Sequence, residues 1–159
     1  PAILGRRLDR PTINLGFSGN GKLEKEVGQF LVELDPAVYV LDCLPNMVAA
    51  EISERTAPMV SQLRTAHPDV PIVLVEDRTY PASWLIPARQ DRNDTSRAAF
   101  KAAYETMLDD GVENLFYVDG NSLLAADRDD TTDGSHPSDL GFFNQANAIE
   151  PALRAALNV

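Results

Sequence analysis

Residues 37–43 read "AVYVLDC", a nearly continuous apolar run that contains β-branched and aromatic side chains. Such a run is typical of a strand that is buried on both faces of a sheet. A similar run, "VPIVLVE", covers residues 70–76, and "NLFYVD" covers residues 114–119. The stretches between these runs are long enough to hold a helix each, so we expect buried parallel strands joined by crossover helices.

Helical patterns lie on both sides of each predicted strand. A further short strand is expected at Thr12–Leu15, and the last helix is expected to bend or break before Pro151. This alternation predicts a three-layer α/β/α fold with a mostly parallel central sheet and one domain over residues 1–159. The predicted helices cover residues 1–9, 23–34, 53–66, 94–111 and 139–157. Ligands of such sheets bind beyond the carboxyl ends of the strands.

The chain of 159 residues carries a formal net charge of −10. Nucleic acids and anionic membranes both require a basic surface, so we expect neither as a partner. No apolar run approaches the roughly 20 residues that span a bilayer, and no charged-then-apolar leader opens the chain. Cys43 is the only cysteine. An internal disulfide is therefore excluded, which leaves cytosol and disulfide-free export open, with the cytoplasm slightly favoured.

A glycine-rich turn, "INLGFSGNG", occupies residues 13–21. It can be interpreted as a dinucleotide site, in which the turn holds a phosphate and Asp42 holds the ribose. That fold uses G-x-G-x-x-G, whereas this turn has G-x-x-G-x-G. A tight turn without a ligand is a second interpretation. A site for the oxyanion of a reacting ester is a third.

Two further segments follow predicted strands at the same edge of the sheet. Asn46 in "LDCLPNM" (41–47) carries two uncharged N–H donors that suit an oxyanion, although a simple turn residue after a proline is the alternative. The loop 77–93 is long for a connection, which favours a functional role as much as a surface excursion. Four side chains could line a pocket, although each could equally belong to the core: Phe17, Met47, Tyr80 and Trp84.

The segment "TDGSHPSDLGF" (132–142) places Asp133 three residues before His136. A carboxylate that accepts from one imidazole nitrogen leaves the other nitrogen free to act as a base. A loop histidine with a merely structural bond is the alternative. A calcium loop among the acidic residues 127–133 does not follow the order of an EF-hand. The other histidine, His67, is interpreted as a helix C-terminal cap.

Taken together and in this order, the three segments resemble the SGNH hydrolases, also called the GDSL-like esterase and lipase family. The similarity covers essentially the whole chain and is nearest to a bacterial branch. "NLGFSGNG" is similar to the family's second block, and Gly19 matches the glycine whose N–H helps to form the oxyanion hole. Asn46 matches the oxyanion asparagine, although Leu44 and Met47 replace the glycine and aspartate that usually flank it. "DGSHP" matches the family's Asp-x-x-His block.

The resemblance implies a flavodoxin-like fold and a serine esterase or acyltransferase that acts on a small-acyl ester, such as an acetyl ester, through an acyl-enzyme. It makes His136 the base, Asp133 its orienting carboxylate, and Gly19 and Asn46 the oxyanion hole, with no cofactor or metal. The block with the nucleophilic serine and the first strand would lie upstream of Pro1, with Ser18 an unfavoured substitute.

The expected partner is a small-molecule ester. The absent strand would leave a sheet edge through which copies of the chain could pair. The alternative functions are a nucleotide- or dinucleotide-binding domain that uses the turn at 16–21, and a non-catalytic α/β binding module.

Overall fold

The computed structural model describes all residues 1–159 and contains one parallel sheet of three strands in the order β1-β2-β3. The strands are β1 (Tyr39–Leu41), β2 (Ile72–Val75) and β3 (Leu115–Val118), and Val40, Val73 and Phe116 lie side by side across them. All three predicted buried runs therefore form strands, shorter at their ends than the apolar patterns.

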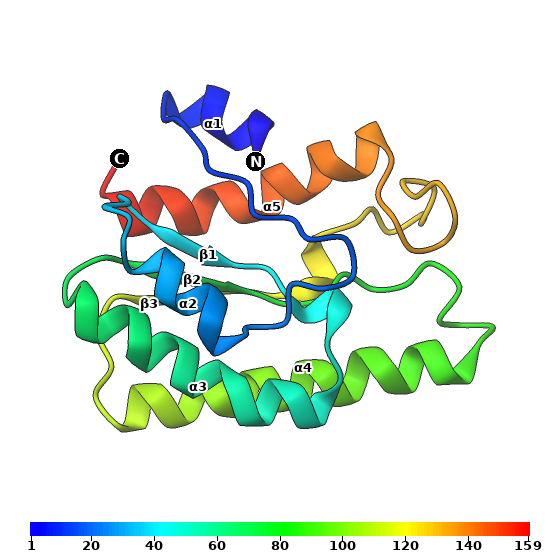
Figure 1. Cartoon of the computed structure of the whole chain (residues 1–159). Helices are drawn as coiled ribbons and strands as arrows, with labels where there is room; N and C mark the ends of the chain where they lie inside the picture. The colour runs from blue at the N-terminus through cyan, green and yellow to red at the C-terminus, as the bar shows by residue number, and fades with distance from the viewer.

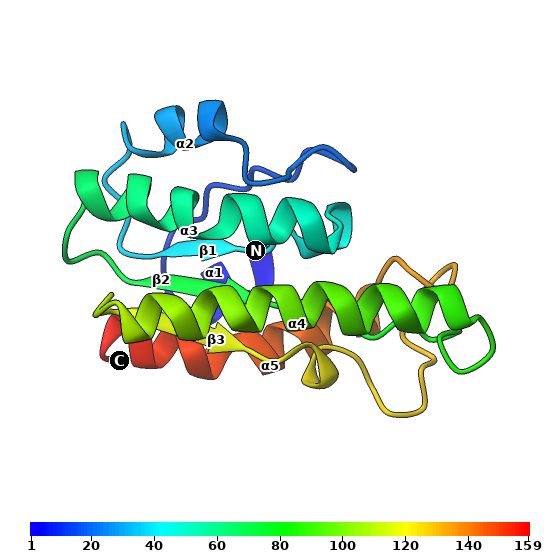
Figure 2. The ribbon, with the colours of Figure 1, turned by 90° about the horizontal axis from the view of Figure 1, so that it is seen from below.

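Five α-helices complete a three-layer α/β/α fold (Figure 1). They are α1 (Ala2–Leu8), α2 (Lys25–Leu31), α3 (Ala49–Ala66), α4 (Pro87–Asp109) and α5 (Asp139–Leu157). Figure 2 shows α3 and α4 on one face of the sheet, with α2 beside α3, and α5 on the other face. α1 lies on the outer side of α5 (Figure 1). None of these helices is both long and apolar enough to cross a membrane.

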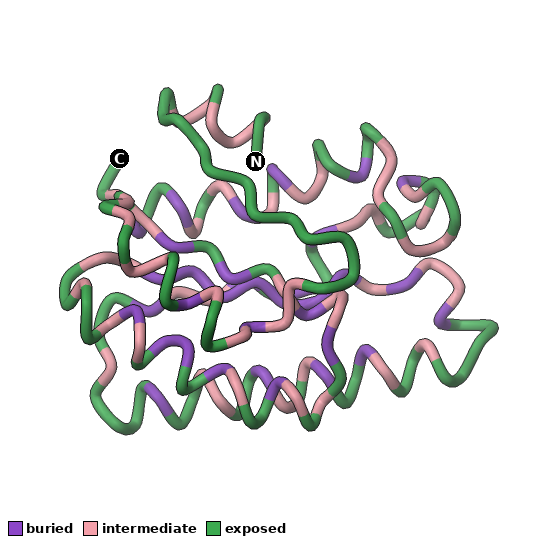
Figure 3. Tube along the Cα trace, in the orientation of Figure 1, coloured by how far each residue is buried: buried purple, intermediate pink, exposed green.

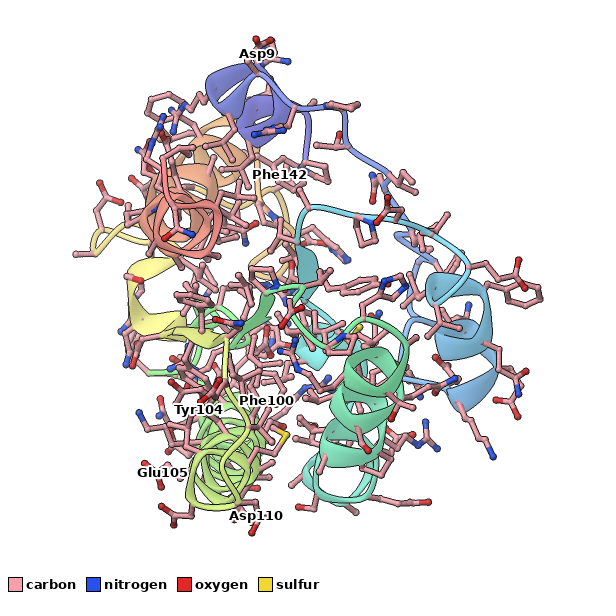
Figure 4. All side chains as sticks on the ribbon, turned by 90° about the vertical axis from the view of Figure 1, so that its left-hand side faces the viewer. Asp9, Phe100, Tyr104, Glu105, Asp110 and Phe142 are labelled. Atoms are coloured by element: carbon pink, nitrogen blue, oxygen red, sulfur yellow. The ribbon has the colours of Figure 1, made fainter.

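The alternation of side chains along β2 builds two cores. Ile72 and Leu74 face α3 and α4, whereas Val73 and Val75 face α5. All four are at most 1% exposed, as a central strand covered on both faces requires. In Figure 4, Phe100 lies on the side of α4 that faces the sheet, and it is fully buried.

The predicted strand at Thr12–Leu15 does not form. Residues 9–20 are exposed along their whole length (Figure 3), with Ile13 68% and Leu15 42% exposed. A short apolar run becomes a strand only when a neighbour satisfies its backbone groups, and no strand lies beside this one. The prediction for 37–43 is corrected in one respect: β1 is an edge strand, and Val40 is 42% exposed on a face that was expected to be buried.

Two helices begin earlier than their apolar patterns indicated, and one is not broken. α4 starts at Pro87, because proline suits the first helical position. α3 starts at Ala49, where the Glu51 side chain accepts from the Val48 N–H at 3.1 Å. α5 is one helix with Pro151 inside it rather than two segments.

Candidate active site

The candidate acid–base pair, Asp133 and His136, lies at the tip of a hairpin-like loop between β3 and α5. Thr131 and Pro137 form an antiparallel bridge, and the Thr132 N–H donates to the His136 carbonyl at 2.9 Å. These bonds bring the two ends of the segment 132–136 together, so its side chains are displayed on a closed turn. No three acidic, histidine or cysteine side chains in the protein gather closely enough to hold a metal ion.

Asp133 and His136 are brought together as the sequence predicted. The Asp133 Oδ2 lies 2.7 Å from the His136 Nδ1, while its Oδ1 accepts from the N–H groups of Ser135 (2.9 Å) and His136 (2.7 Å). The backbone N–H of His136, followed by its ring, lowers the pKa of Asp133 to about 2. The His136 side chain is 77% exposed, and its contact with Asp133 uses only Nδ1, so no hydrogen bond of the protein occupies its Nε2.

The two oxyanion candidates, Gly19 and Asn46, are connected through the glycine turn that contains Gly19. Asn46 ends the 3-10 helix η1 (Leu44–Asn46), directly after β1, and its Nδ2 donates to the Gly21 carbonyl at 3.1 Å. Ser18 and Gly19 both have positive φ, at 36° and 80°, and the Asn20 N–H closes this turn onto Phe17. A Cβ on Gly19 would meet nothing within 4 Å. Glycine is thus favoured there by its backbone conformation and not by lack of space.

The two pairs lie at the same end of the sheet, beyond the carboxyl ends of the strands (Figure 1). No hydrogen bond connects Asp133 or His136 with Gly19 or Asn46. The connection runs instead through α4: Arg89 donates to the Gly134 carbonyl at 3.0 Å, and Arg92 donates to the Pro45 and Met47 carbonyls at 2.7 and 3.1 Å. Residues three apart share a helix face, so one face of α4 contacts both halves of the site.

Sequence reasoning missed these arginines and a buried charged group beside them. Asp77 and Arg78 directly follow β2, and their side chains are 0% and 6% exposed and 2.7 Å apart. Burial raises the pKa of Asp77, and the neighbouring Arg78 opposes that shift. The available signal was the sequence "EDR" at the carboxyl end of a buried strand, because charges are buried there only when they are paired.

The four side chains that could line a pocket or belong to the core divide into two buried and two exposed residues. Met47 is fully buried in the core and Tyr80 is 7% exposed, whereas Phe17 and Trp84 are exposed. Tyr80 lies under the guanidinium groups of Arg78 and Arg89, at 4.9 and 5.7 Å. The predicted cap is confirmed: His67 ends α3, and its Nε2 lies 3.1 Å from the Val32 carbonyl.

A polar cavity of about 530 Å³ lies elsewhere, between α4 and the segment after β3. Glu76, Arg97 and Asp119 line it, and none of the four predicted site residues does. The Glu76 carboxylate in this cavity is already hydrogen-bonded, because it accepts from the Tyr117 hydroxyl and the Gly120 N–H. This cavity therefore does not mark the candidate active site.

The sequence matches the GDSL-like Lipase/Acylhydrolase family over residues 1–154. No curated protein matches it significantly. Among solved structures, a protein from Bacteroides ovatus ATCC 8483 assigned to the GDSL-like lipases is 35% identical, with a TM-score of 0.94 over 99% of this chain and 47% of its own.

A second solved structure is the salicylyl-acyltransferase SsfX3 from a tetracycline biosynthetic pathway. It is 20% identical, with a TM-score of 0.78 over 99% of this chain and 48% of its own. At that identity the likeness shows the fold alone. The chain spans about half the length of both solved relatives.

Proposed function

The chain belongs to the GDSL-like lipase/acylhydrolase family, and from that premise we propose that it carries the acid–base and oxyanion groups of a serine esterase for small-acyl esters. The observation that carries the proposal is the 2.7 Å contact between His136 Nδ1 and Asp133 Oδ2, with the other ring nitrogen free of hydrogen bonds within the protein. A carboxylate in that place holds the proton on Nδ1, so Nε2 keeps the lone pair that a base needs.

The reaction proceeds through an acyl-enzyme. His136 Nε2 takes the proton of a serine hydroxyl while the serine oxygen bonds to the ester carbonyl carbon. The tetrahedral intermediate collapses, its C–O bond to the alcohol breaks, and His136 returns the proton to the leaving alcohol. Water repeats the two steps to release the acid, and an alcohol in place of water would give acyl transfer.

The oxyanion is held by the Gly19 N–H and the Asn46 amide. Asn46 uses one N–H on the Gly21 carbonyl, and an amide nitrogen carries two, so one donor stays available. The Gly19 N–H takes part in no other hydrogen bond of the protein, which leaves it free as well. Each such donor is worth roughly 3 kcal/mol in the transition state.

We assign the nucleophile to a strand that pairs with the free edge of β1, and not to Ser18. β1 is bonded only to β2, so its other edge offers a row of unpaired backbone groups. Apolar side chains are exposed both on β1, at Val40, and on the segment 9–20, at Leu15. Phe142, 51% exposed, lies on the side of α5 that faces the same segment (Figure 4). Without such a strand, a second copy of the chain is the proposed occupant.

The test compares the chain alone with a longer form that carries the preceding segment, using p-nitrophenyl acetate and a serine-directed phosphonate. Labelling and turnover are expected only in the longer form, on an added serine. His136→Ala in that form should lower kcat by several orders of magnitude. The matched control is His67→Ala, at the end of the sheet where the strands begin, and it should leave kcat within twofold.

Two results would contradict this assignment. Stoichiometric labelling of Ser18 in the short chain, abolished by Ser18→Ala, would move the nucleophile into the turn. Equal activity of the His136→Ala and His67→Ala variants would remove the proposed base.

Tight binding of a dinucleotide that Gly19→Val abolishes would favour the alternative in which the turn at 16–21 holds a phosphate.

A further inference from the structure

Two arginines make the side-chain hydrogen bonds that attach residues 133–136 to the protein outside their own loop. Their internal bonds close the turn on itself, and the side chains of Asp133 and His136 are 53% and 77% exposed. The two arginines are Arg78 and Arg89. The direction in which the turn presents His136 is therefore set by these two contacts.

Resting on the proposed function, we propose that Arg78 is the positioning residue of the acid–base turn. Its Nε donates to the Ser135 carbonyl at 2.8 Å and its Nη2 to the Ser135 hydroxyl at 2.7 Å. Ser135 lies between the two functional residues, and its own N–H donates to Asp133. Two bonds from one planar group fix the peptide in orientation as well as in position. Arg89 contributes a single bond, to the Gly134 carbonyl.

Arg78 can act in this way because it is itself immobile. Its Nη1 pairs with the buried Asp77 at 2.7 Å, and its guanidinium lies 4.9 Å above the centre of the Tyr80 ring. Asn93 on α4 donates to the Arg78 carbonyl at 3.0 Å and accepts from the Tyr80 N–H at 3.1 Å. These bonds connect the exposed turn to β2 and α4, which are the rigid part of the fold.

Lysine cannot replace this arginine, because an ammonium is a single point and cannot bridge Ser135 and Asp77 in one plane. In Arg78→Lys we expect the turn to lose its fixed orientation. The hydrogen bond between the Asp133 carboxylate and the His136 Nδ1 should then be weakened. The matched control is Arg64→Lys. Arg64 also donates to backbone carbonyls, those of Pro68 and Val70 at 2.7 Å, but at the opposite edge of the sheet.

The experiment measures the imidazole tautomers by long-range ¹H–¹⁵N NMR at a pH where both histidines are neutral, and needs no activity. The chain has two histidines, so His67 serves as the internal reference. In the wild type the proton of His136 should reside on Nδ1, facing Asp133. In Arg78→Lys the ratio of the Nδ1–H to the Nε2–H form should fall at least threefold, with His67 unchanged. Arg64→Lys should leave His136 as in the wild type.

An unchanged His136 signal in a folded Arg78→Lys protein would overturn the proposal, as would an equal change in Arg64→Lys. Should Arg78→Lys fail to fold, Ser135→Ala removes only the hydroxyl contact, and it must shift the ratio in the same direction by a smaller factor. In the longer form that carries the preceding segment with the nucleophilic serine, called the nucleophile-bearing form, Arg78→Lys should lower kcat about 10- to 100-fold with KM within twofold. A tautomer shift in a protein without esterase activity would refute the proposed function while leaving this inference intact.

Discussion

Replacing Asp133 with asparagine removes one of the three hydrogen bonds of its side chain and keeps the other two. The amide oxygen can still accept from the N–H groups of Ser135 and His136, so the turn is retained. The amide nitrogen then faces the His136 Nδ1, where Oδ2 lay at 2.7 Å. Because an amide N–H needs an acceptor, the ring must move its proton to Nε2, and the base loses its lone pair toward the substrate.

The expected fall in kcat for Asp133→Asn is on the order of 10⁴, the cost of the wrong tautomer in a serine triad. Asp133→Ala loses all three bonds and should fall about as far. Amide hydrogen exchange at Ser135 and His136 distinguishes the two variants, because it should be faster only in Asp133→Ala. Both are assayed with p-nitrophenyl acetate in the nucleophile-bearing form. Activity of Asp133→Asn within tenfold of the wild type would refute the reasoning.

Three further outcomes follow from the same geometry. The pKa of Asp133 is lowered from 3.8 to about 2, so its stabilisation of the turn should be complete above about pH 4 and lost as the pH falls through 2. The measurement is the exchange protection of the Ser135 amide as a function of pH, and Asp133→Asn should keep the protection but lose this dependence on pH. Gly19→Ala, at φ 80°, should destabilise the turn by about 1 kcal/mol and lower kcat more than it raises KM. Gly120→Ala places a Cβ against the Asp77 carbonyl and weakens the Gly120–Glu76 bond of 2.7 Å, so unfolding in urea should show a loss of about 3 kcal/mol that the control Gly16→Ala lacks.

The fold class was predictable because two periodicities dominate the chain. The all-apolar run at 72–75 can only be a strand covered on both faces, and all four of its residues are buried. The stretches around it are long and amphipathic. Parallel strands need a crossover connection of that length, and a helix is the usual one. Helix starts were less predictable because Pro87 and Glu51 act through single contacts at the first turn, which periodicity does not register.

The candidate site was predictable only where its residues lie close in sequence. Asp133 and His136 are three residues apart, so a turn suffices to join them, and the predicted contact is present. Arg78 lies 57 residues from Ser135, and no local pattern indicates such a contact. The sequence left the places of Tyr80 and Met47 open for a related reason, because a side chain after a strand can turn into the core or toward the site. Long-range packing settles both: Arg78 and Arg89 lie over the Tyr80 ring, and Met47 belongs to the core cluster.

The segment 9–20 shows how a correct local preference can fail without its partner. Ile13, Leu15 and Phe17 alternate with polar or small residues, as a strand with one buried face should, yet all three are exposed. β1 shows the complementary defect, since its outer edge is unpaired and Val40 is uncovered beside it. One strand inserted between them would satisfy both sets of backbone groups and cover both sets of apolar side chains. Because such a strand would end beside η1 and the glycine turn, the structural repair and the supply of a nucleophile are the same event in the function proposed here.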